Sequence, residues 1–119
     1  MAKEVNFTDG VIRVLAAGTT QLIAQAIDVS AYDQLDLMLV LVGYEGSAPS
    51  GFTPVIIGGM QRETENCWVT LGTFGALTAA NTAGVLNVPR LFKYGRWSVP
   101  PFTGATAVSF AIRGMARLN

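Results

Sequence analysis

The stretch Gln34-Leu-Asp-Leu-Met-Leu-Val-Leu-Val-Gly-Tyr44 contains the longest apolar run of the chain and decides its fold. Its four leucines, at positions 35, 37, 39 and 41, share one face of an extended strand because side chains alternate across a sheet. The other face begins with Asp36 and continues through Met38, Val40 and Val42. A strand that is apolar on both faces is covered on both. We therefore expect the leucines to face the core, and Met38, Val40 and Val42 to form an oligomer interface.

The composition favours a single all-β domain. Of the 119 residues, 50% are hydrophobic and 13% are charged, and 13 glycines supply turns; an average soluble domain is roughly 25% charged. No apolar run approaches the ~20 residues that cross a bilayer, and the N-terminus has no secretory apolar region. We expect a chain made in the cytoplasm, without a membrane partner. The mean hydropathy of +0.41 indicates apolar surface left over for a protein partner.

Eight short segments with strand character are separated by turn residues. They are residues 11–15, 21–27, 34–44, 53–61, 67–74, 85–88, 93–99 and 106–113. We predict an antiparallel β-sandwich over residues 11–119, of the eight-stranded jelly-roll type. A seven-stranded immunoglobulin-like sandwich is the alternative, although its Cys…Trp…Cys frame is missing.

Two segments are predicted to lie outside the strands. Residues 45–51 contain two glycines, a proline and two serines, which is typical of a loop. Residues 1–10 are predicted to form a flexible N-terminal arm, because they are mostly polar and offer only Val5 and Phe7 as anchors.

The residue types argue against an enzyme. Histidine is absent, which removes imidazole-based triads and metal sites. Cys67 is the single cysteine, and its place beside Trp68 in an apolar segment predicts an inert buried thiol. Acidic residues are interpreted as solvated or capping groups rather than catalytic pairs or calcium ligands: Glu63, Glu65, Asp28, Asp33 and Asp36. We therefore predict no catalytic residue, metal or cofactor.

The net charge is zero, but residues 66–119 hold five bases and no acid. The bases are Arg90, Lys93, Arg96, Arg113 and Arg117. Either strands from the two halves interleave and mix the charges, or the protomer presents a basic face to an acidic partner. Bases and rings also mix around Trp97, as on nucleic-acid-binding surfaces. Strand alternation instead predicts Trp97 in the core with Tyr94 and Arg96 at the surface, so we expect no direct nucleic-acid binding.

Four segments carry a resemblance to a known class of protein. They are Ile27-Asp-Val-Ser-Ala-Tyr-Asp-Gln-Leu-Asp-Leu37, Cys67-Trp-Val-Thr-Leu-Gly-Thr-Phe74, Tyr94-Gly-Arg-Trp-Ser-Val99 and Ala107-Val-Ser-Phe-Ala-Ile-Arg-Gly114. The sequence resembles the small β-sandwich decoration, or cement, proteins that stud the capsids of tailed phages. It is also similar to discoidin-like and carbohydrate-binding jelly rolls, which share the Tyr-x-Arg-Trp sequence pattern.

The resemblance implies a non-catalytic virion protein on the capsid surface. Such a protein forms trimers at symmetry axes of the shell, and its N-terminal arm grips the major capsid protein. The candidate capsid contacts here are Val5, Phe7, Arg90, Lys93, Arg96, Arg113 and Arg117. A neck, tail or head-fibre protein is an alternative within the virion. A carbohydrate-binding module is the alternative outside it, with Trp68, Tyr32, Tyr44 and Phe102 as a candidate sugar platform.

Overall fold

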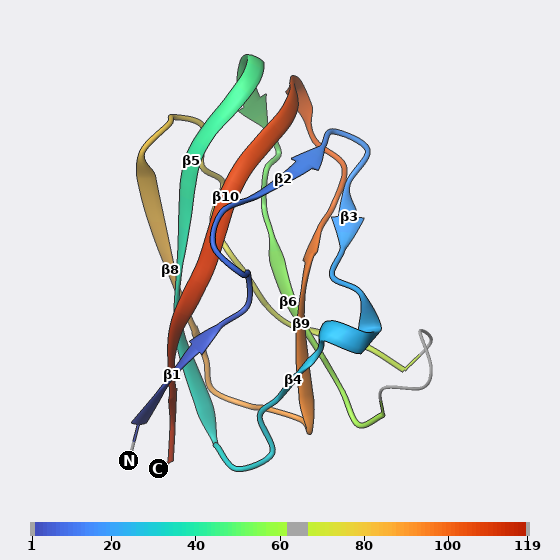
Figure 1. The fold of residues 1–119 in the computed structure, drawn as a ribbon, viewed down its shortest axis with the longest axis vertical. Helices are drawn as coiled ribbons and strands as arrows, with labels where there is room; N and C mark the ends of the chain where they lie inside the picture. The colour runs from blue at the N-terminus through green and yellow to red at the C-terminus, as the bar shows by residue number, and fades with distance from the viewer. Residues whose placement is uncertain (1, 62–66, 119) are drawn as a thin grey trace.

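The computed structural model describes residues 2–61 and 67–118, whose strands form two antiparallel sheets packed as a sandwich (Figure 1). The long sheet contains β1 (Ala2–Asn6), β2 (Ile12–Leu15), β5 (Gln34–Ser50), β8 (Thr82–Val88) and β10 (Thr103–Arg117). The short sheet contains β3 (Thr19–Thr20), β4 (Ile27–Asp28), β6 (Val55–Gly59), β7 (Val69–Thr73) and β9 (Tyr94–Val99). One 3-10 turn, η1 (Ile23–Gln25), lies between β3 and β4. The predicted all-β sandwich is confirmed.

The two sheets have the same plan. In the long sheet β10 pairs with β5 on one side and with both β1 and β2 on the other, and β8 lies beyond β5. In the short sheet β9 pairs with β6 on one side and with both β3 and β4 on the other, and β7 lies beyond β6. Each sheet is therefore four positions wide, and the described residues place ten strands at eight positions, where eight uninterrupted strands were predicted.

The core lies between the inward faces of the two sheets. The four leucines of β5 are at most 2% exposed, as the alternation predicted. Alternation of side chains within residues 106–113 predicts that Val108, Phe110 and Ile112 share the inward face of β10, and all three are at most 1% exposed. β5 and β10 pair along most of their length, so their inward residues form a continuous apolar layer.

An aromatic cluster joins the two sheets. The Phe110 ring packs edge-on against Phe52 and Trp97, with ring centroids 5.6 and 5.5 Å apart. Phe52 also meets Phe102 at 5.7 Å. Such pairs contribute about 0.5–1.5 kcal/mol each beyond the burial of their area. The predicted core position of Trp97, which is 6% exposed, is confirmed.

The loop predicted at residues 45–51 is wrong, because β5 continues to Ser50. Its partner is the first part of β10, where Thr103 pairs with Ser50, and the register slips between them. Gly46 and Gly104 have φ values of +90° and +88° there, a conformation that favours glycine. A Cβ on Gly104 would lie 2.3 Å from the Ala48 carbonyl oxygen. Gly46 and Gly104 lie at these register shifts, which are β-bulges. The start of β8 was also misplaced, because β8 begins three residues earlier than predicted, at Thr82.

The strand predicted at residues 21–27 is also wrong: η1 separates two short strands there. Gln21 is 6% exposed and takes over the pairing with β9. Its backbone nitrogen donates to the Trp97 carbonyl oxygen at 3.0 Å, and the Trp97 nitrogen donates to the Gln21 side-chain oxygen at 3.2 Å. Because a side chain fills one position of the ladder, the backbone turns outward before it rejoins β9 as β4.

The prediction of a flexible arm over residues 1–10 is also wrong, because residues 2–6 form β1. This strand pairs with β10 in the register Ala2–Arg117 to Asn6–Arg113. Phe7 follows and is 2% exposed, and its Cζ lies 3.2 Å from the position of a Cβ on Gly95 of β9. Thr8 continues the contact with β10, since the Ile112 nitrogen donates to Thr8 Oγ1 at 3.1 Å. The apolar anchors of the segment are thus core residues.

Candidate interaction surface

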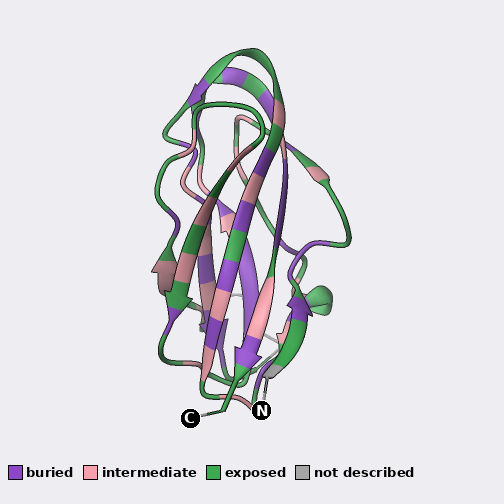
Figure 2. Cartoon of the chain, turned by 90° about the vertical axis from the view of Figure 1, so that its left-hand side faces the viewer, coloured by how far each residue is buried: buried purple, intermediate pink, exposed green. Residues whose placement is uncertain are grey.

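The outer face of the long sheet exposes apolar side chains. Met38 and Val42 of β5 are 46% and 38% exposed, Val85 of β8 is 77% exposed, and Val40 is half-buried. Met38 pairs directly with Val85, and Val40 lies between Ala83 of β8 and Ala111 of β10. We call Met38, Val40, Val42 and Val85 the apolar band. Figure 2 shows how buried and exposed residues alternate along the long strands that carry it.

The apolar band includes all three residues predicted to form an interface. Met38 and Val40 point outward because they alternate with the buried leucines. Val42 is left over at a bulge, since Leu41 pairs with Phe110 and Gly43 with Ser109, and it is nevertheless exposed. Val85 was not predicted to be part of the interface. The alternation of Val85-Leu86-Asn87-Val88 indicates, however, that Val85 faces away from Val88.

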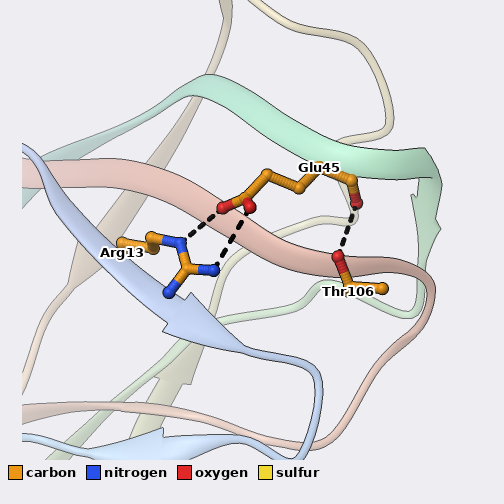
Figure 3. A network of polar contacts seen from close by, with 3 residues as sticks. All are labelled: Arg13, Glu45 and Thr106. Carbon is orange, nitrogen blue, oxygen red and sulfur yellow. Dashed lines mark hydrogen bonds and ion pairs between the residues drawn. The ribbon is translucent and has the colours of Figure 1, made fainter.

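Two ion pairs among the described residues flank the apolar band. At one end, Arg13 of β2 reaches across β10 to Glu45 of β5 with two hydrogen bonds to its carboxylate (Figure 3). The bonds from Arg13 lower the pKa of Glu45, and Glu45 raises the pKa of Arg13. Thr106 Oγ1 donates to the Glu45 carbonyl oxygen at 3.2 Å.

At the other end, Arg117 of β10 and Asp36 of β5 form the second ion pair, with 2.7 Å between Nε and Oδ2. Asn87 Nδ2 of β8 donates to the other Asp36 oxygen at 2.7 Å. The two pairs neutralise their charges within the protomer and give the apolar band a polar rim, and Arg113 of β10, opposite Met38, adds one exposed charge beside it. A hydrophobic centre with a polar rim is the usual anatomy of a protein interface.

Three of the seven predicted capsid contacts are buried within the protomer. Val5 is 8% exposed, while Phe7 and Arg96 are each 2% exposed. The surface position predicted for Arg96 is wrong, because its Nε donates to the Gln21 carbonyl oxygen at 2.9 Å. Its guanidinium carbon lies 4.7 Å from the ring centroid of Trp68, which covers it. In this conformation none of the three side chains is available to a partner.

The other four predicted contacts are exposed but do not form one patch. Arg113 lies on the outer face, opposite Met38 in register, and Arg117 is committed to Asp36. Lys93 precedes β9, and its amine lies 5.4 Å from the centroid of the Tyr94 ring. Arg90 follows the end of β8. The basic half of the sequence is therefore distributed over different parts of the fold.

The described residues contain no group of three or more potential metal ligands. Asp28 accepts hydrogen bonds from the Ser30 nitrogen and hydroxyl at 2.9 and 2.6 Å, so its carboxylate closes the turn that follows β4. Glu63 and Glu65 lie outside the described residues. The buried position predicted for Cys67 is wrong: the side chain is exposed, because it lies before the start of β7.

The four aromatic residues of the predicted sugar platform have different surroundings. Phe102 is 5% exposed and belongs to the aromatic cluster of the core, and Trp68 is stacked over Arg96. Tyr44 is 38% exposed on β5. Tyr32 lines an open cleft of about 450 Å³ together with Phe92, Lys93, Met60, Leu91 and Ser30. The four rings therefore do not form one platform, and Tyr32 alone among them lines the cleft.

Comparison with known protein families, curated proteins and solved structures gives no match. Among the described residues, no helix is long and apolar enough to cross a membrane.

Proposed function

We propose that this protein is a structural assembly protein of a virion, a capsid decoration or cement protein that self-associates and stabilises contacts between major capsid subunits. It is made in the host cytoplasm, acts on the capsid surface and needs neither cofactor nor catalysis. The observation that carries the proposal is the exposed apolar band with its polar rim. The resemblance supplies the capsid setting, and a neck, tail or head-fibre role would use the same surface in the same way.

The apolar band supports self-association for a physical reason. A β-sandwich needs only the inward faces of its sheets for its own core, yet here Met38, Val42 and Val85 leave apolar area in water. Burying such area is favourable by about 25 cal/mol per Å², and a second copy of the same face is the commonest partner. A standard specific interface covers about 1,600 Å². The resemblance implies a trimer as the assembled form.

We also propose that the eight strand positions are those of a jelly roll. β1 and β2 together fill one position, and β3 and β4 together fill another. The order of positions in the long sheet is then β1/β2, β10, β5 and β8. The order of positions in the short sheet is β3/β4, β9, β6 and β7. Consecutive positions alternate between the sheets except from β6 to β7, the arrangement expected of two interleaved Greek keys.

The absolute mass of the purified protein, measured by light scattering across micromolar concentrations, tests the proposal. We expect an oligomer that Val40→Asp dissociates into folded monomers, because the carboxylate would be buried in the interface. Val69→Asp is the matched control, since Val69 is 50% exposed on β7 of the short sheet. A protein that stays monomeric, and that fails to sediment with capsids, would sink the proposal. A Val40→Asp chain without a folded monomer would place Val40 in the core of the protomer instead.

A carbohydrate-binding module is the second candidate, and the cleft beside Tyr32 favours it. Its exposed Phe92 ring, 41% accessible, and the Lys93 amine offer apolar and hydrogen-bonding surface to a sugar. This candidate predicts a monomer whose tyrosine or tryptophan fluorescence changes with glycan. Phe92→Ala should abolish that change, whereas a trimer without glycan binding contradicts this candidate.

A further inference from the structure

We infer that β8 is a docking edge for a second copy of this chain, through antiparallel β8–β8 pairing centred on Val85. The inference rests on the proposed self-association, and it gives that association two-fold symmetry, so this contact forms a dimer where the resemblance implies a trimer. In the part of the chain that the structure describes, β8 pairs with β5 on one side only. In Figure 1 it lies at the outer margin of the long sheet. An edge strand with free backbone groups is a template for another strand.

Natural sheets usually protect such edges with charges, short strands or bulges, and the other described edges have these devices. β1 and β2 carry Lys3, Glu4 and Arg13, and a gap separates the two strands. The edge formed by β3 and β4 consists of two-residue strands. The ladder of β7 is interrupted by a register slip opposite Ile56 and Ile57.

β8 lacks every one of these devices. Its seven residues, Thr82-Ala-Gly-Val-Leu-Asn-Val88, include no charge and no proline. They pair with β5 in an unbroken register from Leu35–Val88 to Leu41–Thr82. The middle residue of the strand is Val85, whose 77% exposure is the largest among the large apolar residues of the described chain. An unprotected, regular and uncharged edge is therefore left open in the long sheet.

A second β8 is a complementary occupant for this edge. Antiparallel pairing about Val85 sets that residue opposite its own copy, so two exposed valines meet on the outer face. It sets Asn87 opposite Ala83 and Leu86 opposite Gly84, and it brings no like charges together. Gly84 leaves room for the larger leucine, because the only other atom within 4 Å of a Cβ there is Leu77 Cδ2 at 3.8 Å. The two apolar bands then join into one face.

Cysteine crosslinking tests the register directly, in a Cys67→Ser background because Cys67 is itself exposed. In Val85→Cys the two thiols lie opposite each other, with Cβ atoms about 4.5–5.5 Å apart. We expect mild oxidation to convert most of the protein to a covalent dimer. In the matched control Ala83→Cys, four residues of offset separate the two thiols by about 13 Å along the strands, and we expect little dimer. Equal crosslinking of both variants would overturn the inference.

Val85→Lys provides the second test, because it sets like charges opposite each other at the centre of the contact. We expect it to raise the dimer dissociation constant up to about fivefold through the like charges alone, and further because the two valines no longer pack against each other. The control Leu22→Lys changes a residue of similar exposure, 67%, beside η1, and should leave the constant unchanged. An oligomer that dissociates with Val40→Asp but neither crosslinks at position 85 nor responds to Val85→Lys refutes the β8 contact and leaves the proposed function standing. A chain that is monomeric throughout refutes both.

Discussion

Replacing Phe7 with alanine distinguishes a structural N-terminus from a free arm. Phe7 is 2% exposed, and its ring lies against Gly95 of the opposite sheet. A buried Phe→Ala substitution typically costs about 3–5 kcal/mol. The upper part of that range applies here, because Gly95 has no side chain that can move into the space. Domains of this size are stable by only about 5–15 kcal/mol, so Phe7→Ala should remove a large share of the total.

Urea unfolding followed by circular dichroism measures this cost. With a slope near 2 kcal/mol/M, within the usual range of about 1–3, the midpoint should fall by about 2 M. The control is Val11→Ala, because Val11 is 56% exposed and exposed substitutions usually change stability by no more than about 0.5 kcal/mol. If Phe7→Ala costs no more than Val11→Ala, residues 2–7 are an arm and the packing against Gly95 does not hold in solution.

Three further predictions concern packing, polar pairing and pH. Gly114→Ala should destabilise the protein by about 1–3 kcal/mol or more, because the new Cβ would lie 2.0 Å from the Asp36 carbonyl oxygen. Gly75→Ala is the control: its Cβ would meet nothing within 4 Å, so the same urea unfolding assay should show no loss of stability. Gln21→Leu should cost about 1–3 kcal/mol for each buried backbone group that it leaves without a partner, and calorimetry measures the loss. The hydrogen bonds from Arg13 lower the pKa of Glu45 in the folded protein. The ion pair therefore stabilises the fold fully above the pKa of Glu45 in the unfolded chain, and this stabilisation disappears as the pH falls through the folded pKa. NMR titration of the Glu45 carboxyl group should show a low midpoint, and Arg13→Ala should raise it.

The long central strand and the inward faces followed from the sequence because their signal is local. Alternation of side chains is a property of one strand, so the leucines of β5 and the inward residues of β10 could be assigned without knowing their neighbours. Trp97 was placed in the core for the same reason. Met38 and Val40 were expected on an outer apolar face, and the structure exposes that face.

The misassigned segments depended on distant partners. Residues 45–51 have the composition of a loop, but the beginning of β10 offers them a ladder. Gln21 has the sequence context of an ordinary strand residue, but its side-chain oxygen accepts a hydrogen bond from the Trp97 nitrogen. Arg96 occupies an outward position by alternation, yet the Gln21 carbonyl and the Trp68 ring enclose it. Local periodicity carries no information about such long-range contacts.

The pairing of Ala2 with Arg117 determines how the fold would respond to mechanical force. The first and last described strands are neighbours, and Figure 1 shows both chain ends at the same end of the molecule. Hydrogen bonds of an antiparallel ladder run perpendicular to the strands, so a pull that separates the two ends loads them one pair at a time. The hydrogen bonds between β1 and β10 would break in sequence, starting from the Ala2–Arg117 pair, while β5 and β8 bear almost no tension. A tether through both ends would therefore yield at low force, whereas a load spread over the outer face of the long sheet would be resisted by all of its strands together.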